Sequence, residues 1–182
     1  MTYDVIVVGV GGMGSATVYH LAQRGLKVLG LEQFDIPHEF GSSHGVTRII
    51  RLAYAEHPDY VPLLRRAYEL WRELEKRVHE QLLFITGGID AGDENSETVR
   101  GSLLSCKLHD LPHEQIDAAS LARRFPGYRL AAGMVGVYQP DAGFCYRSVV
   151  LLPMSGRLKS SVRWCKHTNG SLSGELKITG SL

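Results

Sequence analysis

Cysteine is scarce in this chain and offers no basis for covalent cross-links. The 182 residues include three cysteines, Cys106, Cys145 and Cys165, which are widely spaced and form no C-x-x-C pair. An odd number without paired spacing indicates neither a disulfide framework nor a zinc site. We therefore predict no metal site, and we expect a reducing, cytoplasmic compartment.

The chain also lacks an excess of charge of either sign. Its 20 basic and 19 acidic residues leave a formal net charge of +1. Such a balance creates no field that would draw the protein to nucleic acid or to an anionic membrane. The composition favours a small-molecule partner, and we expect no binding to nucleic acid or membrane.

Long hydrophobic runs are missing as well. The apolar run Val5–Val8 is far too short to span a bilayer. It follows Asp4 directly, without the basic segment and cleavage site of a secretion signal. We therefore expect an unexported chain.

What the sequence does contain, at its start, is the pattern of a βαβ crossover. The β-branched run 3–8 ends at a glycine and predicts a strand buried on both faces of a parallel sheet. Residues 12–24 predict a helix that stops at Gly25, and residues 26–31 predict a second buried strand. A strand, a short glycine turn, a helix and a strand within about thirty residues form the right-handed βαβ unit.

The turn between the first strand and the helix carries a glycine motif. Gly9, Gly11 and Gly14 form G-x-G-x-x-G. The first glycine allows a tight turn, the second lets the backbone approach a pyrophosphate, and the third lets helix and strand pack closely. The motif alone is weak evidence for nucleotide binding, because glycines in a turn are often needed only for the conformation of the turn.

An acidic residue at the end of the second strand strengthens the motif. Glu32 lies about twenty residues after the glycine loop, where a carboxylate can accept hydrogen bonds from ribose hydroxyls. The same charge repels a 2′-phosphate, which disfavours NADP. This constellation fits NAD and FAD equally, so it leaves the choice between them open.

Further elements follow after a polar loop at residues 33–46. A long helix is predicted from Asp59 to about Glu80, because its apolar residues recur at spacings of three and four. The other predicted elements are a strand at 82–89, helices at 97–108 and 118–125, and a strand at 134–138.

Three basic residues lie together after the loop. His44, Arg48 and Arg51 stand at positions i, i+4 and i+7, so a helical turn would place them on one face. The alternative is a solvated basic turn paired with Glu39 or Glu56, and the spacing alone favours this alternative.

The segment 41–51, GSSHGVTRIIR, resembles a segment that follows the FAD motif in the monomeric sarcosine oxidase and N-methyltryptophan oxidase family. Other segments look like that family in the same order, namely 3–9, 31–38, 48–54, 60–62 with 69–71, 124–127 and 139–143. The resemblance covers about residues 3–148.

The resemblance implies an α/β fold, with a Rossmann-like FAD-binding βαβ domain and part of a mixed-sheet substrate domain. It assigns residues 1–80 to the FAD-binding portion and residues 81–148 to the substrate-domain portion. Residues 149–182 depart from the family and are rich in Ser, Gly and Lys. We interpret them as an atypical tail from a truncated or frame-disturbed reading frame.

The resemblance also implies site residues. As catalytic residues it places His44 and Arg48 beside the flavin ring and pairs Arg51 with the substrate carboxylate. A guanidinium can hold a carboxylate in two-point geometry, and fixed positive charge near the ring favours the anionic reduced flavin. The implied FAD-binding residues are Gly9, Gly11, Met13, Gly14, Glu32, Ser42, Thr47 and Arg48.

The activity implied by the resemblance is FAD-dependent oxidation of a secondary (N-methyl) amino acid such as sarcosine by a monomer. The amine becomes an imine that water hydrolyses, and oxygen takes the electrons to give hydrogen peroxide. Two alternatives stay open, an NAD-dependent dehydrogenase and a non-catalytic nucleotide-binding fragment.

Overall fold

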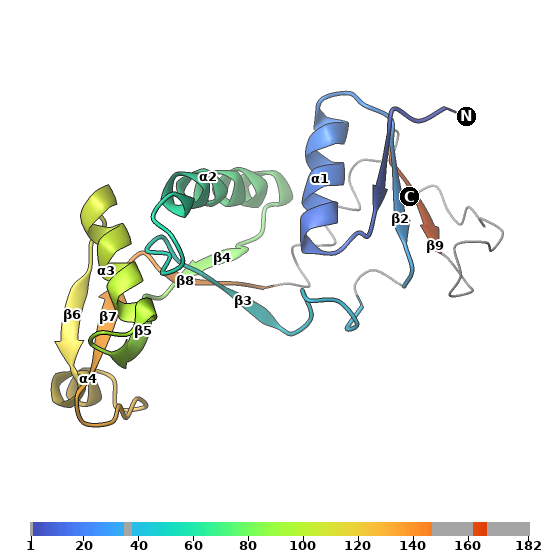
Figure 1. The fold of residues 1–182 in the computed structure, drawn as a ribbon. Coiled ribbons are helices and arrows are strands. Elements are labelled where there is room, and N and C mark those ends of the chain that lie inside the picture. Colours follow the sequence, from blue (N-terminus) through green and yellow to red (C-terminus); the bar gives the residue numbers. More distant parts are fainter. Residues whose placement is uncertain (1, 35–37, 147–161, 167–182) are drawn as a thin grey trace. The chain divides into compact units, whose positions relative to one another are not determined.

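The computed structural model describes residues 2–34 and 38–146, together with the backbone of residues 162–166 (Figure 1). Backbone contacts divide the chain into two compact units, Met1–Thr47 with Tyr146–Leu182, and Arg48–Cys145. The functional division at residues 80 and 148 stays a prediction. The tail predicted from residue 149 lies outside the described residues except for one strand.

The first unit is built on a parallel sheet with the strand order β1-β2-β9. Its elements are β1 (Val5–Val8), α1 (Gly12–Gln23), β2 (Val28–Glu32) and β9 (Val162–Lys166). Both strand pairs are parallel, with Val5 opposite Val28 and Val28 opposite Val162. The α/β class and the βαβ crossover are therefore confirmed, whereas β9 was not expected from the sequence.

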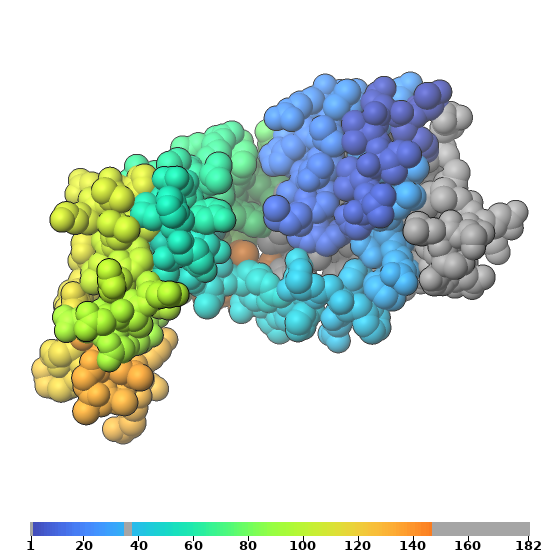
Figure 2. All heavy atoms as spheres, in the orientation of Figure 1, coloured from blue at the N-terminus to red at the C-terminus, as the bar shows by residue number. Residues whose placement is uncertain are grey.

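Helix α1 covers one face of this sheet, as the ribbon shows (Figure 1). Val18 and Ala22 of the helix form a buried cluster with Val28, and Val5 and Val7 pack against it. In the space-filling view, the atoms of the N-terminal residues that form β1 and α1 lie together as one blue group (Figure 2). The helix ends as predicted, since Gly25 takes a φ of +84°, a conformation that glycine adopts without steric cost.

The expectation that β1 is buried on both faces is wrong for this chain. Ile6 and Val8 point away from α1 and are 58% and 78% exposed. An apolar run indicates that a strand can be buried. It does not show whether other elements of the chain cover the second face of the sheet.

The second unit contains two further three-stranded sheets, with the orders β3-β8-β4 and β5-β7-β6. The pair β4–β8 and both pairs within the second of these sheets are antiparallel. The strands are β3 (Thr47–Ile50), β4 (Leu83–Ile85), β5 (Gly88–Asp93), β6 (Glu114–Asp117), β7 (Met134–Gln139) and β8 (Gly143–Tyr146). The helices are α2 (Tyr60–Val78), α3 (Glu97–His109) and α4 (Ala118–Arg124).

Helix α2 confirms the predicted amphipathic helix. Val61, Leu74 and Val78 are buried on the predicted face, and the helix ends where His79 adopts a left-handed conformation with φ of 59°. Among the described residues, no helix combines the length and the apolar character needed to cross a membrane.

One local prediction in this unit is wrong. The strand expected at 82–89 is split into β4 and β5 because Gly87, with a φ of +78°, turns the chain between them. A helical turn at the basic cluster does not form, because the β-branched residues Thr47, Ile49 and Ile50 lie in strand β3.

Candidate functional site

The glycine turn of the first unit has the geometry that its motif predicts. Gly9 adopts a φ of +85° directly after β1. A side chain at Gly14 would overlap the carbonyl oxygen of Gly9, so only glycine allows α1 to begin this close to the strand. By contrast, a Cβ at Gly11 would meet no atom within 4 Å, so packing leaves room in front of this residue.

The N-terminus of α1 faces the same turn. Its N-cap residue Gly11 supplies no side-chain hydrogen bond. The amide of Gly12 donates to Ser43 Oγ at 3.2 Å, which brings the polar loop onto the start of the helix. The other N-terminal amides of α1 have no side-chain cap among the described residues, and such amides are suited to bind an anion.

Glu32 lies at the mouth of this turn. Its Oε2 accepts the amide of Val10 at 2.8 Å. Its Oε1 accepts the amides of Gln33 at 2.8 Å and Phe34 at 3.2 Å. Oε1 also lies 3.4 Å from His38 Nε2, whereas Oε2 accepts one amide and so still has room for a hydroxyl donor.

These residues line a cleft of about 540 Å³ in the first unit. Six of the residues predicted to bind the cofactor are among its walls, namely Gly9, Gly11, Met13, Gly14, Glu32 and Ser42. Thr47, in β3, is not among the lining residues, and Arg48 belongs to the second unit.

The cleft also has walls that sequence reasoning missed. Phe34, His38, Phe40 and Ser43 line it as well. The ring centroid of Phe34 lies 4.9 Å from that of His38 and 4.6 Å from that of Phe40. His38 Nε2 is 3.4 Å from Glu32 Oε1. The sequence signal that could have indicated these walls is the presence of three aromatic rings in one short glycine-containing loop.

The chemistry of this cleft fits a dinucleotide. It combines a glycine turn that admits close approach, helix amides without a side-chain cap, and a carboxylate that retains acceptor capacity. These groups match a pyrophosphate and a ribose, respectively.

His44 and Arg48 both have contacts within the chain, and their place beside the flavin ring stays a prediction. His44 Nδ1 lies 2.9 Å from the carbonyl oxygen of Gly41. The backbone oxygen of Arg48 accepts from the Sγ of Cys145 at 3.7 Å, and burial raises the pKa of that thiol. Because strand β3 replaces the helical turn, the spacing of three and four residues does not define a common face here.

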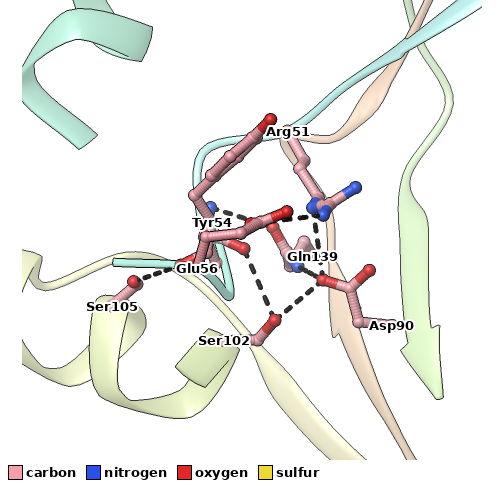
Figure 3. A network of polar contacts seen from close by, with 8 residues as sticks. Arg51, Tyr54, Glu56, Asp90, Ser102, Ser105 and Gln139 are labelled. Carbon is pink, nitrogen blue, oxygen red and sulfur yellow. Dashed lines mark hydrogen bonds and ion pairs between the residues drawn. The ribbon is translucent and has the colours of Figure 1, made fainter. Parts of the chain in front are cut away.

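Arg51 lies between two carboxylates of its own unit (Figure 3). Its Nη2 is 3.9 Å from Glu56 Oε2 and its Nε is 3.5 Å from Asp90 Oδ2. The pairing with Glu56 is the one that the solvated-turn alternative predicted, whereas Asp90 was not expected. The guanidinium also lies 5.1 Å from the ring centroid of Tyr54.

An open cleft of about 910 Å³ adjoins Arg51 in the second unit. Its walls come from the segment after β3 and from α3, and they include Arg51, Ala55, Glu56, Arg100, Leu104 and Lys107. Three basic side chains and two acidic ones, Glu56 and Glu97, line this cleft, so it offers guanidinium and ammonium donors to a small anion such as a carboxylate.

Comparison with known proteins gives consistent results. The model of a family described as FAD dependent oxidoreductase matches residues 4–159. Monomeric sarcosine oxidase of Streptomyces avermitilis is 50% identical over 142 residues, which is 78% of this chain and 37% of that protein. N-methyl-L-tryptophan oxidase of Yersinia pestis is 38% identical over 144 residues, which is 79% of this chain and 39% of that protein.

Solved structures agree with this result. NikD, an unusual amino acid oxidase essential for nikkomycin biosynthesis, superposes with a TM-score of 0.77 at 30% identity and covers 89% of this chain and 43% of its own. Glycine oxidase from Geobacillus kaustophilus shares the fold, with a TM-score of 0.69 at 21% identity over 90% of this chain and 46% of its own.

Proposed function

Because this chain belongs to the FAD dependent oxidoreductase family, we propose that it is the nucleotide-binding part of an oxidase for N-methyl amino acids. The chain spans 37% of the length of one curated relative and 39% of another. The complete reaction is therefore part of the proposal. The observation that carries it is the glycine turn with Glu32 at its mouth.

The family is FAD-dependent, so the cofactor is FAD, and the NAD alternative is set aside. In our proposal Gly9, Gly11 and Gly14 let the backbone approach the pyrophosphate, and Glu32 accepts from the ribose. Met13 and Ser42 line the same cleft, and Thr47 and Arg48 complete the proposed set. FAD, when bound, supplies the two-electron acceptor that amino acid side chains lack.

The chain's own residues would bind and orient the substrate. Arg51 offers a planar group with donors for the substrate carboxylate, which fixes the amine end of the molecule. His44 and Arg48 are proposed to supply positive charge beside the flavin ring. A substrate such as sarcosine follows from the names of the similar oxidases.

Location and assembly are proposals as well. Cys106 and Cys145 are free and buried, which supports a reducing, cytoplasmic compartment. A monomeric state is supported by the name of the relatives, monomeric sarcosine oxidase.

The cofactor proposal is tested by a glycine substitution that spares the fold. Gly11→Ala places its Cβ in open space, so the apo melting temperature should not change, while the approach of a pyrophosphate is obstructed. We expect FAD to raise the melting temperature of the wild-type chain and of Gly127→Ala, which also meets nothing within 4 Å, but to raise that of Gly11→Ala much less. An equal FAD shift in all three proteins, or a larger shift with NADH, would refute the proposed site.

Turnover is a separate question from binding. We expect the chain alone to bind FAD weakly and to release no peroxide when sarcosine is added. A purified chain that stays yellow and produces peroxide would show that the described units suffice for the reaction.

A further inference from the structure

The two carboxylates beside the Arg51 guanidinium, Glu56 and Asp90, contact it in different ways. Its side chain is 23% exposed, and its Nε is buried without a hydrogen-bond partner although Asp90 Oδ2 lies only 3.5 Å away. A buried donor left without an acceptor is costly. The ion pair with Asp90 therefore offsets the cost of burying this Nε–H group.

Asp90 is far better fixed than Glu56. The Asp90 side chain is 14% exposed, whereas that of Glu56 is 59% exposed. Asp90 Oδ2 also accepts from Ser102 Oγ and from Gln139 Nε2, both at 2.8 Å (Figure 3). An exposed ion pair such as that with Glu56 contributes little because solvent screens it.

The supports of Asp90 are themselves part of the core. Gln139 is 3% exposed and Ser102 is fully buried. Gln139 Oε1 accepts the amide of Ala53 at 3.1 Å. The same network therefore fixes the backbone two residues after Arg51 and the carboxylate that faces the Arg51 side chain.

We propose that Asp90 is a positioning residue for Arg51: it holds the Nε edge of the guanidinium and leaves the two terminal nitrogens to bind a carboxylate. This inference rests on the proposed role of Arg51 in binding the substrate. A guanidinium can pair with a carboxylate along its Nε edge or across its two terminal nitrogens. With the Nε edge occupied by Asp90, only the end-on geometry remains.

The charge of Asp90 allows a clear test, because positioning and simple electrostatics predict opposite results. As a negative charge beside Arg51, Asp90 should weaken the binding of any anion. As a positioning residue it should strengthen that binding, because the guanidinium no longer has to be ordered when the ligand arrives.

The first measurement is the dissociation constant of sarcosine for the full chain, obtained by NMR titration. We expect Asp90→Asn to raise this constant by about tenfold. Glu56→Gln, the matched control, removes the same charge from the same guanidinium without loosening it, so its constant should stay within about threefold of the wild type or fall. A lower constant in Asp90→Asn would overturn the proposal.

The second measurement needs no ligand. The Nε–H proton of Arg51, assigned by its disappearance in Arg51→Lys, should exchange with water at least about tenfold faster in Asp90→Asn than in the wild type, since a buried, paired donor is protected. Glu56→Gln should leave the exchange rate unchanged. Ser102→Ala keeps the charge of Asp90 but removes one hydrogen bond to it, so it should accelerate Nε–H exchange less. This variant replaces Asp90→Asn in the test if Asp90→Asn does not fold.

The two measurements separate this inference from the proposed function. If Arg51→Lys leaves the affinity for sarcosine unchanged, or if no variant binds sarcosine, the substrate role of Arg51 fails while the exchange result still decides whether Asp90 holds Nε. If exchange is the same in Asp90→Asn as in the wild type, the positioning role is wrong whatever the affinity.

Discussion

The two units of the chain treat their polar groups in opposite ways. In the first, α1 begins at Gly11 without a side-chain cap, and Glu32 retains acceptor capacity beside a cleft. In the second, α3 and α4 begin with side-chain caps, and Asp90 Oδ2 accepts from two buried side chains, Ser102 and Gln139. A helix start without a side-chain cap is suited to a ligand, whereas a carboxylate bound by buried side chains is suited to hold another side chain in place.

The largest effect should come from breaking the buried network of the second unit. Gln139→Leu removes the acceptor of the Ala53 amide and one donor to Asp90, both in a buried environment. We expect the free energy of unfolding to fall by about 2 to 5 kcal/mol, because each orphaned group carries its own desolvation cost. Urea denaturation measures this loss.

The matched control for this loss is Gln115→Leu. Gln115 is exposed and its Nε2 donates to Glu94 at 3.3 Å. Its replacement should change stability by less than about 0.5 kcal/mol. Equal losses for the two variants would contradict the contrast between a buried network and a solvated edge.

Close packing at glycine is a property that the two units share. A Cβ at Gly14 would overlap the backbone oxygen of Gly9, and one at Gly101 would overlap the backbone oxygen of Ala55. Each change to alanine should cost about 1 to 3 kcal/mol, because backbone cannot move aside as a flexible side chain can.

The effects of these two glycine substitutions on FAD binding should differ, and this difference tests the comparison of the two units. Gly14→Ala should also abolish the rise in melting temperature with FAD, whereas Gly101→Ala should destabilise the chain and leave that rise intact. Loss of the FAD effect in both variants would show that the first unit does not bind the nucleotide by itself.

A smaller effect, which depends on pH, concerns the end of α2. Burial works to raise the pKa of Glu75, but Arg72 and the amides of Leu82 and Leu83 outweigh it, so that the pKa is lowered below 4.5. A carboxyl whose pKa is lower in the folded state stabilises the fold above its unfolded pKa, and this contribution is lost as the pH falls through the folded pKa. Glu75→Gln should therefore cost about 1 to 2 kcal/mol at pH 7, and the difference from the wild type should shrink below pH 4.5. A difference that stays constant from pH 7 to pH 3 would refute this account.

The parts of the fold that could be predicted from sequence are those encoded by adjacent residues. The crossover and the helix α2 follow from glycine spacing and from apolar residues three or four apart. Glu32 could be placed at the mouth of the turn because it ends the strand that pairs with β1.

The rest could not be predicted, for identifiable reasons. Strand β6 has the polar sequence EQID, and it takes its strand conformation from pairing with β7. The spacing of Arg48 and Arg51 would place them on one face only in a helical turn, and the β-branched residues between them favour strand β3 instead. The network around Asp90 joins residues 12 and 49 positions away along the chain, so only the tertiary fold brings it together.

The smallest effect tests the contrast in helix caps directly. Ser96 Oγ accepts the amide of Val99 at 3.3 Å at the start of α3, whereas α1 begins at Gly11 with no such bond. Ser96→Ala should lower the free energy of unfolding by about 1 kcal/mol, whether or not FAD is present. Gly11→Ser, which adds a cap to α1, should stabilise the apo chain by a few tenths of a kcal/mol and weaken FAD binding, because the new hydroxyl competes with phosphate for the same amides. Stronger FAD binding by Gly11→Ser would mean that those amides are not the phosphate site.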